Sequence, residues 1–409
     1  MKKTIAILLI GVLLTGCSTS RTSPRPIMTA EVTISPTPQT QKLEKTVAVP
    51  ETQIQKTPEV QTQQSPIVQT KLEEKTWFAG AIGNAKIHAQ LEITGNKVSG
   101  VYYYDQYKTN ISLKGTIDDR VKDLQAVSLT EDTDKKGNIR GLFRSKDYLQ
   151  GFWKSGSEVY SMYLIREGAG ISPPQIAGKG AMLFDGYWTG KGTGYFAGSN
   201  AYIKVLFDDL LYYQLQAFNG SHSGGLDSFA TIDNNIARTV FKDTAYDKKD
   251  ENVVFEFSLE DYCLNLKSNR YDYMCGTGVG FDSSYTKGKI SITKPTAQQV
   301  GIVASKEKDE LFKKLVGDKY DTFISYTAAV SYEDKILDGR KVKAGSSLLR
   351  GVNGYCFYII SSEYIYAAIL SNNIDYYTND PKYANKLPQL MEDWATYRKG
   401  LKINYNFKE

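Results

Sequence analysis

Residues 76–107 read TWFAGAIGNAKIHAQLEITGNKVSGVYYYDQY, and they set the structural class of the globular part of the chain. Apolar and polar residues alternate in IHAQLEI, the pair Gly95-Asn96 interrupts the alternation, and VSGVYYY resumes it. Alternation with a period of two predicts a half-buried strand, and two such runs around a tight turn predict an antiparallel hairpin. Folded structure is therefore expected to begin as β structure at about residue 76.

More short alternating runs follow directly, namely ISLKGTI, LQAVSLTE, GLFR, YLQGFW and YSMYLI. Roughly eight strands in about 90 residues leave no room for crossover helices, as in up-and-down meanders. We therefore expect residues 76–168 to close into a small antiparallel barrel.

The first barrel is similar to avidin-like and other calycin barrels in three short motifs at its hairpins: Trp77-x-x-Gly80, Val98-Ser99-Gly100-x-Tyr102 and Gly151-Phe152-Trp153. The resemblance implies a calycin-like domain of the kind found in uncharacterised envelope lipoproteins. Such a barrel can carry a small ligand if its interior is hollow, and the sequence leaves open whether side chains fill it.

Two further domains are expected after the first barrel. Strand and turn alternate again over 180–294, which predicts a second meander barrel. Residues 300–409 combine helical spacing in KEKDELFKKLVGDKYDTFISYTAAV, paired strands in SSLLRGVNGYCFYII and EYIYAAILSNNIDYYT, and a proline-started helix in ANKLPQLMEDWATYRKG. They predict a small α+β domain, and an extension packed on the second barrel is the alternative. The chain is expected to be mainly β.

The composition agrees with a tyrosine-rich β protein. The chain has 29 Tyr and 34 Gly but only 2 His and 6 Met. Few histidines leave few general bases and metal ligands, so we expect no catalytic residue, metal or cofactor. A net charge of +5, dispersed along the chain, is too small to indicate nucleic acid as a partner.

The leader MKKTIAILLIGVLLTGC has two early lysines and an apolar run over 5–14. The run has the length of a signal-peptide core and is too short to span a bilayer. It ends in Leu14-Thr15-Gly16-Cys17, which resembles the lipobox of bacterial lipoproteins. The resemblance implies that a signal peptide over 1–16 is removed and that Cys17 is lipidated, with a palmitate-type chain adding to its diacylglycerol. An ordinary signal peptide or an uncleaved anchor is the alternative.

This resemblance implies a cell-envelope protein anchored to a membrane by lipid. In a diderm bacterium, Ser18 after the cysteine favours the outer membrane, and otherwise the cell membrane is expected. Thr, Gln, Pro and Ser dominate the stretch up to residue 75, and no aromatic residue appears in it. Such a composition predicts a disordered tether, so 17–75 is expected to be the lipidated cysteine and its tether. A short strand at KTVAV is the alternative.

The remaining cysteines carry two expectations. Cys263 and Cys275 flank LNLKSNRYDYM, in which residues 268–270 are expected to form a hairpin turn. Their near-symmetric positions predict a disulfide, which would stabilise by roughly 3 kcal/mol, with two buried thiols as the alternative. Cys356 lies in the apolar run GYCFYII and is expected to be a buried, inert thiol.

Several motifs nearly match functional patterns. The stretch DTDKKGNIRGLF over 132–143 imitates a calcium loop, but Lys136 and Phe143 replace ligands, so we interpret it as a polar hairpin turn. GSHSG places His222 where a nucleophile elbow has serine, and turn chemistry is the simpler interpretation. His88 is expected to be half-buried in a strand. The neighbours Asp208 and Asp209 cannot form one acid pair, because adjacent strand residues face opposite sides.

The best candidates for ligand binding are tyrosines, because aromatic faces stack on sugars and apolar ligands. We single out Tyr102 and Tyr104, with His222 as a loop candidate. Tyr212-Tyr213 and Tyr376-Tyr377 form similar clusters, and core packing is the alternative for all of them.

The function expected from these features is a non-enzymatic binding or structural role in the envelope. Expected partners are the membrane, through the lipid anchor, and an envelope protein or a cell-wall glycan. The alternatives are an inhibitor or immunity-type protein directed against a hydrolase such as lysozyme, and a small-ligand or cell-wall-binding calycin. A hydrolase would require two carboxylates that converge in one cleft.

Overall fold

The computed structural model describes residues 75–134, 136–242, 252–398 and 400–409. The expected signal peptide, lipidated Cys17 and tether up to residue 74 lie outside these residues. Within the described ranges, no helix combines the length and the apolar character needed to cross a bilayer.

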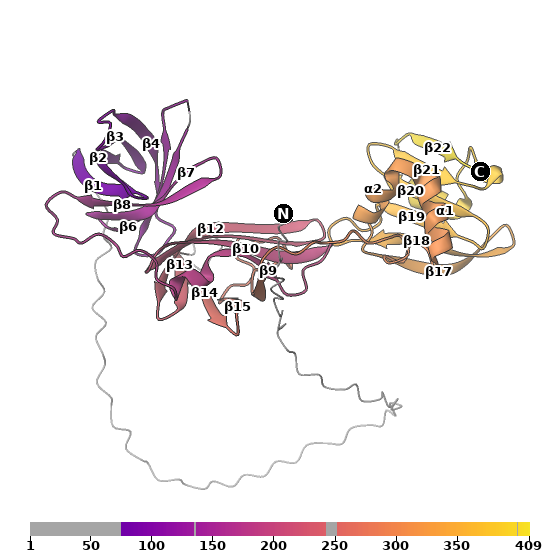
Figure 1. The fold of residues 1–409 in the computed structure, drawn as a ribbon. Coiled ribbons are helices and arrows are strands. Elements are labelled where there is room, and N and C mark those ends of the chain that lie inside the picture. Colours follow the sequence, from indigo (N-terminus) through magenta and orange to yellow (C-terminus); the bar gives the residue numbers. More distant parts are fainter. Residues whose placement is uncertain (1–74, 135, 243–251, 399) are drawn as a thin grey trace, which may run out of the picture. The chain divides into compact units, whose positions relative to one another are not determined.

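The first barrel confirms the meander expected over 76–168. Its strands are β1 (Thr76–Ile82), β2 (Ala85–Thr94), β3 (Lys97–Tyr104), β4 (Ile111–Asp118), β5 (Gln125–Glu131), β6 (Asn138–Ser145), β7 (Tyr148–Ser155) and β8 (Glu158–Arg166). Each strand pairs antiparallel with the next, and β1 pairs with β8 to close the barrel (Figure 1). The quoted hairpin is β2–β3, with Gly95 at φ 61° in its turn.

Side chains from all eight strands of the first barrel pack into its interior. On β2 the alternate residues Ile87, Ala89, Leu91 and Ile93 are buried, as the sequence alternation predicts. The interior side chains include Phe78 of β1, Phe143 of β6 and Leu149 of β7. The interior of this barrel is therefore a packed core.

Glycines permit the close strand contacts of this small barrel. A Cβ atom on Gly80 would lie 1.9 Å from the carbonyl oxygen of Tyr163 on β8. A Cβ atom on Gly151 would lie 2.0 Å from the carbonyl oxygen of Arg140 on β6. Any side chain at either position would push neighbouring strands apart. Both glycines belong to the motifs that resemble calycin barrels, so those motifs mark positions of close backbone approach.

The second barrel also confirms the predicted architecture. After η1 (Ala181–Phe184), its strands are β9 (Gly186–Gly190), β10 (Ala197–Phe207), β11 (Leu210–Asn219), β12 (His222–Asp233), β13 (Ile236–Lys242), β14 (Asn252–Glu260), β15 (Cys263–Ser268) and β16 (Ser283–Lys287). Neighbours in sequence pair antiparallel, and β9 closes the barrel between β16 and β10. Asn234 and Asn235 turn β12 into β13 with φ of 48° and 62°, the left-handed values that asparagine tolerates.

The structure does not form the expected hairpin between Cys263 and Cys275. Cys263 pairs with Glu260 across the β14–β15 turn, whereas Cys275 forms an isolated bridge with Gly224 of β12. After β15 the Asn269 side chain bonds the Val254 amide at 2.8 Å, and the chain continues as a loop instead of a return strand. The predicted disulfide is absent from the described residues, because the two cysteines lie against different strands.

The C-terminal residues form the expected small α+β domain. Its elements are α1 (Lys306–Val316), η2 (Gly317–Lys319), α2 (Tyr320–Ser325), β17 (Ala329–Leu337), β18 (Arg340–Leu348), β19 (Cys356–Ile360), β20 (Ile365–Leu370), β21 (Ile374–Thr378), η3 (Pro381–Tyr383), α3 (Gln389–Thr396) and β22 (Ile403–Phe407). The strands form one sheet in sequence order, with β22 parallel to β21. Ser305 caps α1 by accepting a hydrogen bond from the Lys308 amide.

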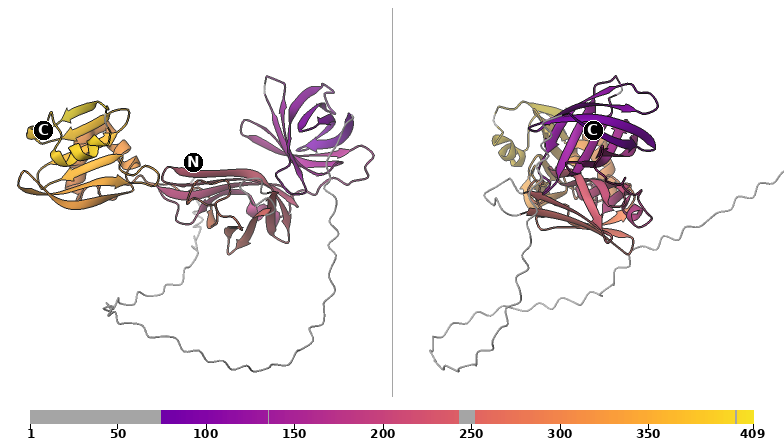
Figure 2. Two further views of the ribbon diagram at one scale, coloured as in Figure 1. Left: turned by 180° about the vertical axis from the view of Figure 1, so that it is seen from behind. Right: turned by 90° about the vertical axis from the view of Figure 1, so that its left-hand side faces the viewer.

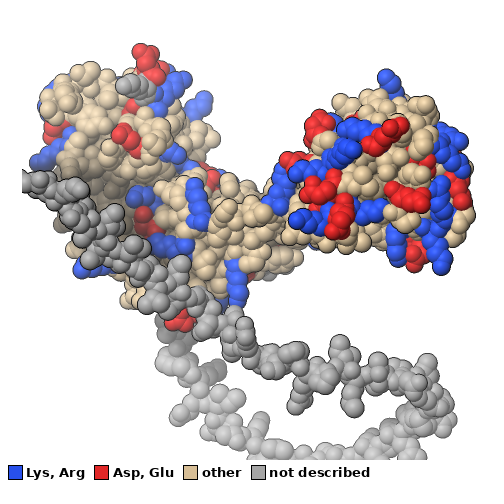
Figure 3. All heavy atoms as spheres, turned by 45° about the vertical axis from the view of Figure 1, so that its right-hand side comes forward, with Lys and Arg blue, Asp and Glu red and all other residues tan. Residues whose placement is uncertain are grey.

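This sheet is buried on both faces, and Figure 2 shows helices packed against it. Tyr358 and Tyr377 belong to the core under α1 and α2, whereas Tyr376 belongs to the core that includes α3. The Tyr376-Tyr377 cluster therefore packs in the two cores, which is the alternative to ligand binding that the sequence left open. Cys356 is fully buried, and burial raises the pKa of its thiol to about 12. On the face in Figure 3, acidic and basic side chains of this domain are interspersed.

Candidate binding site between the two barrels

The two barrels are joined by backbone hydrogen bonds. Val121, which follows β4 of the first barrel, forms an isolated antiparallel bridge with Phe241 on β13 of the second. The amide of Lys122 donates to the carbonyl oxygen of Val240 at 2.7 Å. A strand-like contact of this kind fixes the register between the two barrels at this point.

Apolar packing reinforces this contact. Phe152 of β7 belongs to the same buried cluster as the interior of the second barrel. Its ring centroid lies 4.8 Å from that of Tyr212 on β11 and 6.1 Å from that of Phe229 on β12. Leu142 of β6 joins this cluster as well. The barrels therefore share one cluster of buried apolar side chains, which stabilises their mutual position through apolar burial.

The two neighbouring aspartates at the β10–β11 turn have separate tasks. Asp208 accepts a hydrogen bond from the Gly178 amide at 2.7 Å. Asp209 reaches the first barrel, where it lies 3.4 Å from Arg144 and accepts a hydrogen bond from Gln150 at 3.2 Å. As expected from the sequence, the two aspartates do not form an acid pair. Asp209 forms further contacts between the barrels, with Arg144 and Gln150.

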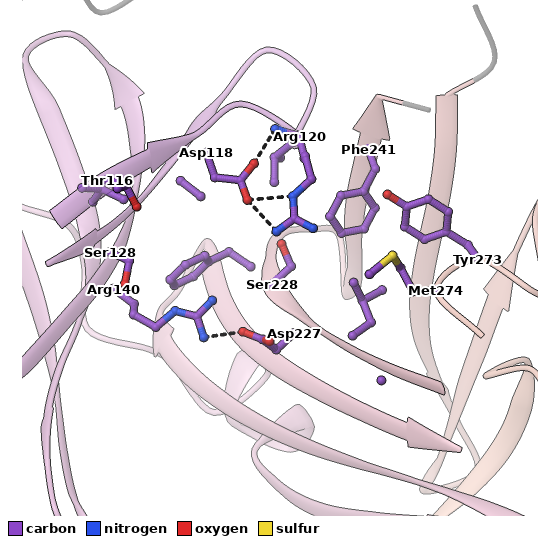
Figure 4. Close-up of a pocket in the computed structure, with 16 residues that line it drawn as sticks. Thr116, Asp118, Arg120, Ser128, Arg140, Asp227, Ser228, Phe241, Tyr273 and Met274 are labelled. Atoms are coloured by element: carbon purple, nitrogen blue, oxygen red, sulfur yellow. Dashed lines mark hydrogen bonds and ion pairs between the residues drawn. The ribbon is translucent and has the colours of Figure 1, made fainter. Parts of the chain in front are cut away.

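A pocket of about 290 Å³, called here the junction pocket, lies between the barrels (Figure 4). Its charged lining residues are Asp118, Arg120, Arg140 and Asp227, and its aromatic ones are Phe229, Phe241 and Tyr273. Asp118, Arg120 and Arg140 come from the first barrel, and the other four come from the second. The volume is close to the lower end of known small-ligand pockets.

Arg140 and Asp227 form an ion pair across the junction (Figure 4). The Arg140 Nη1 donates to the Tyr212 hydroxyl at 3.0 Å, and that hydroxyl donates to Asp227 Oδ2 at 3.2 Å. The guanidinium also lies over the Tyr212 ring, 5.2 Å from its centroid. Burial raises the pKa of Tyr212 to about 12, so the hydroxyl remains a hydrogen-bond donor at neutral pH.

Arg120 and Asp118 form the second charged pair. Arg120 donates from Nε to Asp118 Oδ2 at 2.7 Å and from its backbone amide to Oδ1 at 2.9 Å. Burial opposes ionisation of Asp118, but the hydrogen bonds from Arg120 outweigh it and lower the pKa of this carboxyl group. The same contact raises the pKa of Arg120. Both groups are therefore charged at neutral pH, and each remains about half exposed to a ligand.

The apolar wall of the junction pocket consists of Phe241, Tyr273 and Met274. The rings of Phe241 and Tyr273 are stacked with centroids 5.5 Å apart and an interplanar angle of 29°. Met274 is 49% exposed beside them (Figure 4). Phe241 is buried, so the half-buried Tyr273 and the exposed Met274 provide the apolar surface next to the four charged side chains.

The arrangement is suited to binding polar molecules. Two guanidinium groups can receive carboxylates and two carboxylates can receive ammonium or hydroxyl groups. Among the described residues, no three His, Cys, Asp or Glu side chains are close enough together to hold a metal ion.

The sequence-based candidates Tyr102 and Tyr104 lie in the first barrel. Tyr102 is 1% exposed and donates its hydroxyl hydrogen to Glu131, a buried carboxyl group. Trp153 Nε1 donates to the same oxygen of Glu131 at 2.6 Å, and the Gly137 amide donates to the other oxygen at 3.0 Å. Tyr104 is half-buried, 5.6 Å from Tyr102 between ring centroids. The Tyr102 ring thus serves the core, and its position does not support ligand binding.

His222 begins β12 of the second barrel, so the structure does not bring it together with the two candidate tyrosines. It pairs with Asn219 across a turn in which Gly220 has φ 62°. This geometry confirms the expected turn chemistry. His88 is half-buried in β2 as predicted, with its Nδ1 2.8 Å from Glu167. The calcium-loop imitation begins directly after β5 and its second half belongs to β6, so strands flank its described turn residues, in agreement with a hairpin turn.

Sequence reasoning missed most of the junction pocket. Tyr212 was among the tyrosine clusters, but Arg120, Arg140 and Asp227 were not singled out. Each is a charged residue in or next to an alternating strand, and such residues normally face solvent. In the sequence, the lining residues stand out only as charged residues near aromatic residues on several predicted strands. Many surface strands show the same pattern, so it does not identify a pocket.

Comparison with protein-family models finds no match, and comparison with curated proteins finds none. Among solved structures, the DNA polymerase III beta chain of Streptococcus pneumoniae is 9% identical, with 80% of this chain and 86% of that chain covered and a TM-score of 0.10. A DnaN sliding clamp of Pseudomonas aeruginosa, bound to griselimycin, is 7% identical, with 78% and 92% covered and a TM-score of 0.10. Such TM-scores carry no argument, so the function is inferred from the geometry of the site.

Proposed function

We propose that the chain is a lipid-anchored protein of the cell envelope that binds a cell-wall fragment without transforming it. The lipobox at 14–17 and the tether-like composition up to residue 75 support the anchor. The junction pocket supports the binding role, and it is the single observation on which that role depends.

The ligand class follows from the charges of the pocket. Arg120 and Arg140 suit carboxylates, and Asp118 and Asp227 suit ammonium groups. Tyr273, whose ring is supported from behind by the buried Phe241, and the exposed Met274 suit the apolar face of a sugar or a peptide side chain. A muropeptide, which carries sugars, carboxylates and an amino group, combines these features. Its binding would replace part of the water around half-exposed charges.

The pairing of charges also favours binding over catalysis. Each carboxylate of the junction pocket is held by an arginine, through Asp118–Arg120 and Asp227–Arg140. A carboxylate that must accept or deliver a proton near neutral pH needs a raised pKa, whereas that of Asp118 is lowered.

Isothermal titration of the detergent-solubilised mature protein with purified muropeptides tests the binding role. We expect binding by the wild type and a loss of about tenfold in affinity for Arg120→Ala, since a charge-assisted hydrogen bond is removed. Arg238→Ala is the matched control, because Arg238 is as exposed as Arg120 and also pairs with a carboxylate, Glu256. No binding, or equal losses in both variants, would overturn the proposal; stable capture of lysozyme instead would favour the inhibitor alternative.

The anchor is tested separately by labelling cells with a palmitate analogue. Label is expected in the wild-type protein and not in a Cys17→Ala variant. Label that persists in the variant, or never enters the wild type, would contradict lipidation at Cys17 while leaving the binding role intact.

A further inference from the structure

The outer face of β9, β10 and β11 carries a row of side chains that the junction pocket does not use. We call it the tyrosine strip and define it by Tyr187, Asn200, Tyr202, Gln214 and Gln216. Tyr202 pairs directly with Tyr187 on one side and with Gln214 on the other. Two residues along, Asn200 pairs with Thr189 and Gln216.

Strand periodicity explains why these residues face outward. Residues directly opposite each other share a face of the sheet, and residues one apart do not. The residues between them, such as Trp188, Ala201 and Leu215, are buried in the barrel core. The outward positions hold aromatic rings and amides. Charged residues there would keep the protein soluble equally well, so solubility does not explain this choice of residues.

Two pockets adjoin along the strip. One, of about 620 Å³, includes Tyr187, Tyr202 and Gln214 together with Lys154 of the first barrel. The other, of about 330 Å³, includes Tyr187, Asn200, Gln216 and Lys289. Tyr187 lines both pockets, so they lie next to each other at its side chain, and the two together are called here the groove. A ligand that reaches both pockets must be extended, as a chain molecule is.

The groove has the chemistry of a sugar-binding surface. The rings of Tyr187 and Tyr202 lie 4.8 Å apart between centroids, and Tyr187 is 47% exposed. Tyrosine rings stack on the apolar faces of sugar rings, and amides such as those of Gln214 and Gln216 both donate to and accept from hydroxyl groups. Gln214, Gln216 and Asn200 are all exposed.

The charge of the groove selects the class of sugar. Among the described residues that line the two pockets, none is Asp or Glu. Lys204 lines the larger pocket and is paired at 3.4 Å with Asp185, which does not line it. Lys154 and Lys289 have no carboxylate partner among the described residues, and Lys289 Nζ lies 4.0 Å from the centroid of the Tyr187 ring. The two exposed ammonium groups leave the groove positive.

We propose that the tyrosine strip binds a linear acidic polysaccharide. Its sugar rings stack on Tyr187 and Tyr202, its hydroxyl groups bond the amides of Gln214 and Gln216, and its carboxylates pair with lysines at the two pockets. This site goes beyond the proposed function and does not depend on the lipid anchor, although Arg140 lines both its larger pocket and the junction pocket.

The test uses the detergent-solubilised mature protein and a galacturonate hexamer, with a neutral galactose hexamer as the comparison ligand. We expect the acidic hexamer to bind and the neutral one to bind at least about tenfold more weakly, with the difference shrinking at high salt because exposed charges are screened. Tyr202→Ala should weaken binding of the acidic hexamer about tenfold. Tyr262→Ala, at an exposed tyrosine in the β14–β15 turn, is the control.

A second pair of variants guards against misfolding of Tyr202→Ala. The double substitution of Lys154→Ala and Lys289→Ala changes only exposed side chains and should abolish the preference for the acidic hexamer, whereas Lys267→Ala on β15 should not. The proposal is overturned if the wild type fails to bind, binds both hexamers equally, or keeps its preference in the double variant. Binding lost in Arg120→Ala but retained in the strip variants would also overturn it and would move the ligand to the junction pocket.

Discussion

Arg140 of the first barrel and Asp227 of the second are joined in an ion pair that is buttressed by the Tyr212 hydroxyl. The contact joins residues on β6 and β12 that are distant in sequence, and it borders the junction pocket. Because Arg140 also lines the 620 Å³ pocket, one side chain connects the two sites. The geometry of both sites therefore depends on how the barrels are held together.

The first prediction concerns barrel closure. Gly151→Ala should destabilise the protein by more than about 3 kcal/mol, because the added Cβ would lie 2.0 Å from a backbone oxygen that cannot move without opening the barrel. Gly194→Ala is the control, since no atom lies within 4 Å of an added Cβ there. Urea unfolding of both variants checks this, and equal unfolding free energies would contradict it.

The second prediction concerns the buried carboxyl group of Glu131. Glu131→Gln should lower the unfolding free energy by about 1–3 kcal/mol, because an amide nitrogen replaces one carboxylate oxygen and cannot accept a hydrogen bond. The nitrogen would face either the Gly137 amide or the donors of Tyr102 and Trp153, and those donors would lose their acceptor. Glu158→Gln, at an exposed glutamate that begins β8, should have little effect. Thermal unfolding monitored by circular dichroism compares the two, and a neutral Glu131 variant would refute this role.

The third prediction concerns pH. The pKa of Asp118 is lower in the folded protein than in the unfolded chain, where it is about 3.9. The pairing with Arg120 therefore stabilises the protein fully at pH values above the unfolded-state pKa, and this stabilisation is lost as the pH falls through the folded-state pKa. Asp118→Asn should therefore be less stable than the wild type at pH 7 and equally stable at about pH 2. The effect should be small, because both side chains are about half exposed.

Urea midpoints measured at a series of pH values check this sign. Asp233→Asn, at an exposed aspartate that ends β12, provides the comparison. If the difference in urea midpoint between Asp118→Asn and the wild type grew as the pH fell, the stabilising role assigned to the Asp118–Arg120 pair would be contradicted.

The fourth prediction concerns thiol chemistry. Burial raises the pKa of Cys275 to about 11, so its alkylation rate should keep rising with pH well beyond 9. Cys356, which is fully buried, should react only after unfolding. Mass spectrometry of iodoacetamide-treated, unreduced protein measures both rates. A Cys275 that reacts only after reduction would reinstate the disulfide that the sequence predicts with Cys263.

Sequence reasoning reached the architecture because local patterns determine it. Alternation over β2 and β3 and turn residues such as Gly95 and the Asn234-Asn235 pair are local signals, and a meander needs only neighbouring strands to pair. Helix α1 was equally predictable from the helical spacing of its apolar residues. These signals require no knowledge of distant contacts.

The sites were less readable, because they depend on contacts between distant residues. Asn269 accepts a hydrogen bond from the amide of Val254 on β14, and the chain then continues as a loop, so the symmetric hairpin on which the disulfide prediction relied does not form. The burial of Tyr102 depends on its partner Glu131, whose charge would suggest the surface. The junction pocket requires Val121 to meet Phe241, which no local pattern indicates.

Hydrogen exchange of the mature protein with and without a saturating muropeptide tests the central claim, that one ligand is held between both barrels. The account predicts slower exchange of backbone amides at two places in the same experiment, around residues 118–121 of the first barrel and 225–229 of the second, and loss of both effects in Arg120→Ala. Protection confined to one barrel, or located away from these segments, would contradict it.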